Sequence, residues 1–439
     1  MTTPTITRRS ALQVGAAALA VPFVFRHHAT AAPSETLAHA SFGAGGMAGS
    51  DIGSLTGSKN LKLVAVADVD LTQLAAIKKR LPEVRIYQDW RELLDKEKKL
   101  DSCNVSTPDH MHAAITMRAM QQGLHVYTQK PLTQTIYEAR QLTKVAGEKE
   151  LVTQMGIQIH SNEIHRMVVA IIQDGAIGKV KEVHSWSSKD WGDLAPKPAR
   201  KDKVPAGLDW DAWLGVAADR PFIAGYYHPG NWRRRLDFGT GTFGDMGCHI
   251  LDPVFTSLAL TSPKTVRSDG GPAGSYNWGL NARVTYVFPK TKYTDETLTL
   301  HWYDGNQRPD ASVKALLGKR GLHDQGSIYV GDKGVLYSPY IAAPVLLPEK
   351  DFSEYKKPNP GSNNHYLEFV EACRGKGKTS TPFSYSGPLT ESVLLGCLAT
   401  RFDKKTLDWD AKEMKVTSVK EANAFVRRTY RKGWEVKGL

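Results

Sequence analysis

Runs of apolar residues alternate with amphipathic stretches across residues 33–156. Residues 63–67 are all apolar, which is typical of a strand that is covered on both faces of its sheet. The next stretch, residues 71–81, has the spacing of an amphipathic helix, and the two patterns continue to take turns through this segment. Such alternation predicts an α/β domain built on a doubly wound parallel sheet.

The pattern changes after residue 156. Alternate residues are apolar from 282 to 288 and again from 298 to 302, so these strands have one buried face and one face in water. We therefore predict a second domain over residues 157–439, of the α+β type, with a mostly antiparallel sheet. The length of 439 residues also favours two domains, because a single hydrophobic core rarely grows so large.

The first 32 residues differ in kind from the rest. Arg8 and Arg9 precede an apolar stretch over residues 14–25, and a small-x-small pattern follows at residues 29–31. This arrangement resembles a twin-arginine export signal, which predicts a periplasmic or otherwise exported protein that meets the export machinery and leaves the membrane once the signal is removed. A membrane anchor is the alternative, but the apolar stretch is shorter than the roughly 20 residues that span a bilayer.

The distribution of charge and of cysteines argues against a nucleic-acid-binding protein and against a cysteine metal site. The formal net charge is +12, yet the basic residues lie in short, scattered clusters such as 78–80 and 233–235. The absence of a basic stripe argues against a nucleic-acid partner. The four cysteines are far apart and have no metal-type spacing, so we expect buried free thiols. They are Cys103, Cys248, Cys373 and Cys397.

A glycine-rich segment, SFGAGGMA at residues 41–48, follows an apolar run and opens a helical pattern. Gly43 permits a tight turn, and Gly45 lets the backbone approach a pyrophosphate at the helix N-terminus. Asp68 ends the next predicted strand, 25 residues after Gly43, where a carboxylate accepts hydrogen bonds from ribose hydroxyls. A 2′-phosphate would be repelled there, so the pattern predicts a Rossmann domain that binds NAD rather than NADP.

Two further strand ends carry polar side chains. Residues 106–112 read STPDHMH, and residues 129–131 read Gln-Lys-Pro. In an open parallel sheet, ligands bind beyond the carboxyl ends of the strands, so both segments are expected beside the nicotinamide. Pro131 restricts Lys130 to extended geometry and so directs its ammonium group; the alternative is a surface lysine in a turn. The complete predicted cofactor set is Gly43, Gly45, Gly46, Met47, Asp68, Ser106, Thr107, Pro108, His112, Gln129 and Lys130.

A second constellation lies in the segment FGTGTFGDMGCHILD at residues 238–252. Asp245 and His249 are four residues apart and share a face if the segment is helical. The small residues 239–244 would let a ligand approach that face. The alternative is a structural histidine in the core.

These features together resemble the Gfo/Idh/MocA family of oxidoreductases. The likeness rests on the glycine-rich turn, Asp68, STPDHMH, the Lys-Pro pair, GAIGKVKEVHSW at residues 175–186 and GDMGCHILDP at residues 244–253. The resemblance implies a Rossmann domain, a second domain with a large open sheet, and pairing of subunits into a homo-oligomer. It also implies that Lys130, Asp245 and His249 form the catalytic group. One departure is Gln129, because the family usually has a glutamate there.

Such a group suits the oxidation of a secondary alcohol, which needs a hydride acceptor, a base and a group that stabilises the developing alkoxide. Aromatic faces with polar tips near the same segments favour a small carbohydrate: a sugar, a polyol or a glycoside. The predicted substrate-binding residues are Gln158, Trp191, Tyr227, His228, Trp232 and Arg233. Export favours a tightly bound cofactor that is recycled within each catalytic cycle.

Three alternatives remain open from the sequence. The first is a redox-neutral glycosidase or epimerase that acts through a transient keto-sugar. The second is a cofactor-bound sugar-binding protein without catalysis, suggested by Gln129. The third, which we disfavour because we predict no metal, is a site with Asp245 and His249 as ligands and His228 or His160 as the third.

Overall fold

Six parallel strands form the first sheet of the computed structural model, which describes residues 35–439. Their order is β3-β2-β1-β4-β5-β6, so the chain winds outward from β1 in both directions, as predicted for a Rossmann domain. The strands are β1 (Leu37–Phe42), β2 (Leu61–Ala67), β3 (Arg85–Tyr87), β4 (Ser102–Val105), β5 (His125–Gln129) and β6 (Thr153–Gly156). The export signal predicted over residues 1–32 lies outside the described residues.

Helices connect the strands of this sheet, and their ends follow local sequence signals. The Asp70 carboxylate accepts a hydrogen bond from the backbone N–H of Thr72 and so starts the second of these helices. Thr135 and Glu138 form a reciprocal capping box at the start of the last one. The helices are α2 (Gly46–Leu55), α3 (Leu71–Arg80), α4 (Trp90–Lys96), α5 (Asp109–Gln121) and α6 (Ile136–Glu148).

A nine-stranded sheet follows, in the order β13-β12-β11-β7-β10-β9-β8-β14-β15. All neighbouring strands are antiparallel except β7 and β10, which run parallel, so the predicted mostly antiparallel sheet is confirmed. The strands are β7 (Val180–Ser187), β8 (Thr265–Ser268), β9 (Arg283–Pro289), β10 (Thr294–Asp304), β11 (Gln325–Gly331), β12 (Val335–Pro339), β13 (Val345–Leu347), β14 (Thr406–Asp410) and β15 (Lys415–Val416).

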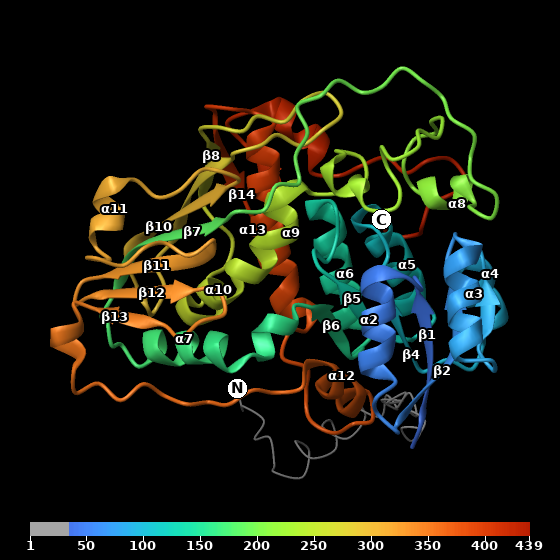
Figure 1. Ribbon diagram of the computed structural model, residues 1–439, viewed down its shortest axis with the longest axis horizontal. Helices are drawn as coiled ribbons and strands as arrows, with labels where there is room; N and C mark the ends of the chain where they lie inside the picture. Colours follow the sequence, from blue (N-terminus) through green and yellow to red (C-terminus); the bar gives the residue numbers. More distant parts are fainter. Residues whose placement is uncertain (1–34) are drawn as a thin grey trace, which may run out of the picture. The chain divides into compact units, whose positions relative to one another are not determined.

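One face of the nine-stranded sheet is covered by helices. The apolar residues of β9 and β10 are buried against them; for example, the rings of Trp302 and Phe243 stack at a centroid distance of 4.5 Å. Figure 1 shows α13 between this sheet and α6 of the Rossmann domain, which it contacts. The helices of this part are α7 (Glu163–Gln173), α8 (Trp210–Leu214), α9 (Gly241–Ile250), α10 (Asp252–Leu258), α11 (Ala311–Ala315), α12 (His365–Cys373) and α13 (Phe383–Thr400).

The cysteines behave as predicted: all four are buried free thiols. Within residues 35–439, no helix combines the length and the apolar character that crossing a membrane requires.

Candidate active site

A cavity of about 350 Å³ lies where the carboxyl ends of the Rossmann strands meet segments of the second domain. All eleven predicted cofactor-binding residues line it. The second domain contributes Asp245 from α9 and a group of residues from the connection between β7 and α9. That group comprises Ala212, Trp213, His228, Pro229, Trp232 and Arg233.

The glycine-rich turn has the shape that a dinucleotide requires. Gly43 has φ +101°, and a Cβ atom there would lie 2.8 Å from the carbonyl oxygen of Ser106. Gly46 has φ +52° and faces open space. Gly45, the N-cap of α2, makes no side-chain capping bond, so the first amides of the helix remain available to a phosphate. These residues fit NAD.

Asp68 follows β2 and lines the same cavity. Its two carboxylate oxygens accept hydrogen bonds from the backbone N–H groups of Ala44 (2.8 Å) and Asp70 (3.0 Å). Burial raises the pKa of Asp68, and these two hydrogen bonds act in the opposite direction. The carboxylate therefore fixes the glycine turn and keeps further lone pairs for ribose hydroxyls.

Lys130 and Asp245 come together across the cavity from the two domains. The Lys130 Nζ atom donates to Asp245 Oδ1 at 2.7 Å and to the main-chain oxygen of Asp245 at 2.9 Å. Arg233 Nε lies 3.6 Å from the same Oδ1 atom. Burial alone would raise the pKa of Asp245, but Lys130 and Arg233 hold it below its usual value. Lys130 therefore points into the site and is held in place by an ionised carboxylate.

His249 lies one helical turn after Asp245 on α9, yet it is not among the residues that line the cavity. Burial, together with the charge of Lys130, lowers the pKa of His249 to about 3, so its ring is neutral at pH 7. Its Nδ1 atom is buried and has no hydrogen-bond partner among the described residues. Its role in proton transfer stays a prediction.

The predicted substrate-binding residues divide into two groups. His228, Trp232 and Arg233 line the cavity. The Arg233 guanidinium lies over the rings of Trp232 (4.3 Å to the centroid) and Trp191 (5.3 Å), so Trp191 supports it from outside the cavity lining.

The other two predicted substrate-binding residues do not line the cavity. Tyr227 is 1% exposed, because its ring packs in an aromatic cluster with Trp213 and Phe238. Gln158 donates hydrogen bonds to the hydroxyls of Tyr127 and Tyr366. Direct substrate contact is not supported for either residue, since each side chain is engaged in internal packing.

The side chains of the alternative metal site, Asp245 and His249 with His228 or His160, are not arranged around one point. Asp245 is paired with Lys130, and His160 instead contacts Asp252. Among residues 35–439, the group of three side chains placed to share an ion is Glu182, His184 and His301, which lies outside this cavity.

Two family models match the chain. One, described as an oxidoreductase family with an NAD-binding Rossmann fold, covers residues 39–157, and the other, described as its C-terminal alpha/beta domain, covers residues 183–436. The chain belongs to the Gfo/Idh/MocA oxidoreductase family.

Individual relatives in this family are distant. The levoglucosan dehydrogenase of Pseudarthrobacter phenanthrenivorans is 23% identical over 44% of this chain and 40% of its own length. The NADP-dependent scyllo-inositol 2-dehydrogenase of Bacillus subtilis is 20% identical over 46% of this chain and 47% of its own length. The chain thus spans about half the length of these curated relatives.

Solved structures share the fold over most of the chain. The WlbA dehydrogenase of Chromobacterium violaceum, in complex with NADH and UDP-GlcNAcA, has a TM-score of 0.63 at 15% identity, covering 86% of this chain and 97% of its own. An inositol dehydrogenase homologue from Azotobacter vinelandii, in complex with NADH and myo-inositol, has a TM-score of 0.57 at 16% identity, covering 86% and 98%.

The departure at Gln129 has a local explanation. The Gln129 Nε2 atom donates to both carboxylate oxygens of Asp51, at 2.9 and 3.1 Å. Ser106 and Tyr366 donate their hydroxyls to the same carboxylate, which is fully buried on α2. A glutamate at 129 would place two carboxylates in contact, so the amide lets this Gfo/Idh/MocA protein keep its buried acid at position 51. Sequence reasoning missed Asp51, because nothing local distinguishes it from a surface acid on a helix.

Asp109 is a second residue that sequence reasoning did not single out, although it lies in the STPDHMH motif. It lines the cavity at the start of α5 and accepts a hydrogen bond from the Thr240 hydroxyl at 2.7 Å. Burial raises the pKa of Asp109 to about 7, against the opposing effects of Thr240, Arg233 and Lys130.

We expect Asp109→Asn to change the pH dependence of stability. Asp109 is neutral in the folded chain and ionised in the unfolded chain between about pH 4 and 7, so it makes the wild-type protein less stable as the pH rises through that window. Asp109→Asn removes this titration. The free energy of unfolding of the variant minus that of the wild type should therefore increase from pH 4 to pH 7. The total increase is about 1.4 kcal/mol for each unit by which the pKa of Asp109 is higher in the folded than in the unfolded chain. Urea titrations at several pH values measure this; a constant difference would contradict it.

Proposed function

We propose that this protein is an NAD-dependent oxidoreductase that oxidises a hydroxyl group, or reduces a keto group, of a sugar, polyol or glycoside. The observation that carries the proposal is the 2.7 Å contact between Lys130 Nζ and Asp245 Oδ1, made in the cavity that also contains the glycine turn and Asp68. Relatives named for levoglucosan, scyllo-inositol and dTDP-sugar substrates support the substrate class. Asp68 favours NAD over NADP.

The residues of the chain provide the proton chemistry. The glycine turn and Asp68 would hold NAD, which would supply the hydride acceptor or donor. In the reducing direction Lys130 donates a proton to the substrate oxygen, and in the oxidising direction its neutral amine accepts that proton; Asp245 holds the amine in place. His249 is neutral and does not line the cavity, so the part we propose for it is to relay a proton behind Lys130 and Asp245. Trp213 and Trp232 supply flat apolar faces for a sugar ring.

Arg233 is proposed to bind the substrate directly. Within residues 35–439 its guanidinium makes no hydrogen bond, and its nearest contact with Asp245 is 3.6 Å, so its donors are available to hydroxyl or carboxylate oxygens of a ligand.

We expect Arg233→Met to raise KM by about 10- to 100-fold with a smaller change in kcat, because a hydrogen bond to a charged group contributes about 1.5–3 kcal/mol. Steady-state kinetics on the best substrate measures this. Arg234→Met is the matched control, since Arg234 also lies beside Trp191 but does not line the cavity. Equal effects of the two changes would remove Arg233 from substrate binding.

The twin-arginine pattern supports export, and an exported enzyme needs a tightly held, recycled cofactor. We propose a periplasmic location and a homo-oligomeric state; fractionation of cells that produce the full chain and light scattering of the purified protein test these two points.

The central experiment is to denature the purified protein, identify any released dinucleotide, and test the refilled enzyme on sugars and nitrophenyl glycosides. Formation or consumption of reduced nicotinamide supports a net oxidoreductase. Nitrophenol release without net reduced cofactor favours the redox-neutral glycosidase. Sugar binding without any change in nicotinamide absorbance favours the non-catalytic alternative.

A further inference from the structure

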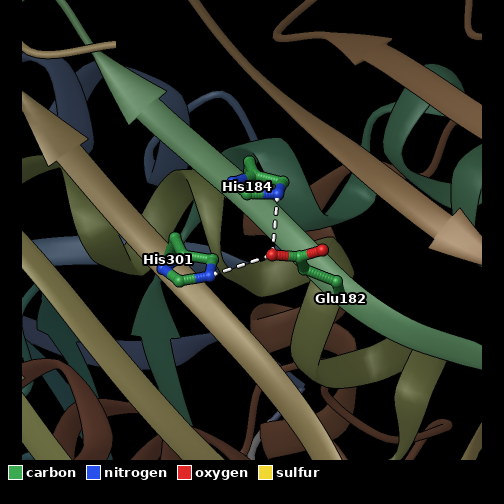
Figure 2. A group of neighbouring side chains, drawn as sticks. All are labelled: Glu182, His184 and His301. Carbon is green, nitrogen blue, oxygen red and sulfur yellow. Dashed lines mark hydrogen bonds and ion pairs between the residues drawn. The ribbon is translucent and has the colours of Figure 1, made fainter. Parts of the chain in front are cut away.

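Three side chains that can bind a metal meet on the face of the nine-stranded sheet that the core helices do not cover. His184 on β7 is directly opposite His301 on β10 in the register of the two parallel strands. Glu182 precedes His184 by two residues and so projects from the same face of the sheet. Their neighbours Val183 and Leu300 project from the other face, into the core. Figure 2 shows both imidazoles directed at the Glu182 carboxylate.

The donor atoms converge on a small volume. His301 Nε2 lies 3.1 Å and His184 Nε2 lies 3.2 Å from the same oxygen, Oε1 of Glu182, and the donor atoms of the three residues all lie within 4.8 Å of one another. Ligand atoms placed about 2.0–2.1 Å from a tetrahedral zinc ion are separated by about 3.3 Å. The two nitrogen-to-oxygen separations, 3.1 and 3.2 Å, are close to that value.

The far nitrogen of each ring already has a partner. His184 Nδ1 contacts the Tyr303 hydroxyl at 3.1 Å, and His301 Nδ1 contacts the Thr285 hydroxyl at 3.0 Å. Metal-binding histidines typically have such a bond on the nitrogen that does not bind the metal, because it fixes the ring orientation. Both Nε2 atoms are therefore the ones presented to the cluster.

One of those nitrogens has no hydrogen bond. His184 Nε2 is buried, and its contact with Glu182 does not have the geometry of a hydrogen bond. A buried polar nitrogen without a partner is costly, and a metal ion at this point would satisfy it. The Glu182 side chain is 37% exposed and the His301 side chain 20%, so an ion can reach the cluster from solvent.

We propose that Glu182, His184 and His301 bind one Zn²⁺ ion, with water completing its coordination. Two imidazoles and one carboxylate favour zinc over magnesium or calcium, which prefer all-oxygen sites. The two imidazole rings are nearly parallel, with planes 11° apart, and the His301 side chain is the more exposed of the two. The site lies outside the catalytic cavity and is independent of the proposed oxidoreductase activity.

The test is zinc titration of the full chain by calorimetry at neutral pH, after chelator treatment and dialysis. We expect one zinc ion per chain, and at least a 10-fold weaker affinity in His301→Gln and in Glu182→Gln. Both changes lie at partly exposed side chains, so the fold should persist, which circular dichroism checks. His323→Gln, an exposed histidine close to the same sheet, is the matched control and should bind zinc as the wild type does.

Crystals soaked in Zn²⁺ provide a second measurement, in which anomalous scattering should show the ion between the three side chains. Two results overturn the proposal: a wild-type affinity no higher than that of His301→Gln, or an ion located elsewhere on the chain. Either result identifies the cluster as a metal-free arrangement of histidines around one carboxylate.

Discussion

Replacing Lys130 with methionine is expected to lower turnover by about 10²–10⁴-fold, the usual contribution of a positioned proton-transfer group. Methionine keeps much of the length and apolar character of the side chain but can neither carry a proton nor pair with Asp245. The glycine turn and Asp68 are unchanged in this variant, so NAD should still bind. Single-turnover measurements on the enzyme loaded with NAD separate loss of hydride transfer from loss of cofactor.

Lys144→Met is the matched control for this variant. Lys144 belongs to α6, and its side chain is 64% exposed with only a loose contact to Glu148. Turnover of the control should equal that of the wild type. Near-normal turnover in Lys130→Met would exclude the lysine from the mechanism, whereas loss of NAD binding together with turnover would assign it to cofactor binding.

The second large effect concerns stability, at a buried pair of residues that do not line the cavity. His160 Nδ1 lies 2.9 Å from Asp252 Oδ1, and the Tyr385 hydroxyl donates to the same oxygen at 2.6 Å. The Asp252 side chain is 2% exposed and that of His160 17%. The His160→Leu change removes the nearest cationic partner of a buried carboxylate and leaves it with Tyr385 and the more distant His165, so it should lower the free energy of unfolding by about 3–5 kcal/mol.

The pH dependence of this effect follows from both members of the pair. Burial alone would raise the pKa of Asp252 and lower that of His160. The attraction between the two groups outweighs burial, so the pKa of Asp252 lies below its usual range and the pKa of His160 lies above its usual value. The stability from Asp252 is lost as the pH falls below about 4, and that from His160 is lost as the pH rises above about 6.5 and through its folded pKa.

The penalty of His160→Leu should therefore be largest between about pH 4 and 6.5 and should decrease on either side. Urea denaturation across this range, with the exposed His323→Leu as control, measures it. A penalty that does not vary with pH would show that lost packing, and not the ion pair, is responsible.

The local parts of the cofactor site could be predicted from the sequence. Gly43 and Gly45, the acid at the end of β2 and the polar residues after β4 and β5 are encoded in short segments, and the topology of a parallel sheet brings all strand ends to one edge. All eleven residues that the sequence predicted to bind the cofactor line the cavity. The placement of Asp245 and His249 on one face of a helix could also be predicted, because it depends only on their spacing of four residues.

Contacts between segments far apart in the chain could not be predicted in this way. That Tyr227 and Gln158 do not line the cavity depends on their contacts with Trp213 and Tyr366, and closeness to the site in the sequence does not predict those contacts. The buried acid behind Gln129 depends on Ser106 and Tyr366, which are separated from Asp51 by 55 and 315 residues.

The sequence by itself determined the two-domain α/β architecture, the dinucleotide turn and the position of Lys130 at a strand end, because hydrophobic periodicity and glycine chemistry act over a few residues. Only the tertiary structure decided which partners meet: Lys130 with Asp245, Gln129 with Asp51, His160 with Asp252, and two histidines of neighbouring strands with Glu182. Burial and distance set those charges and hydrogen bonds, and both are properties of the folded chain.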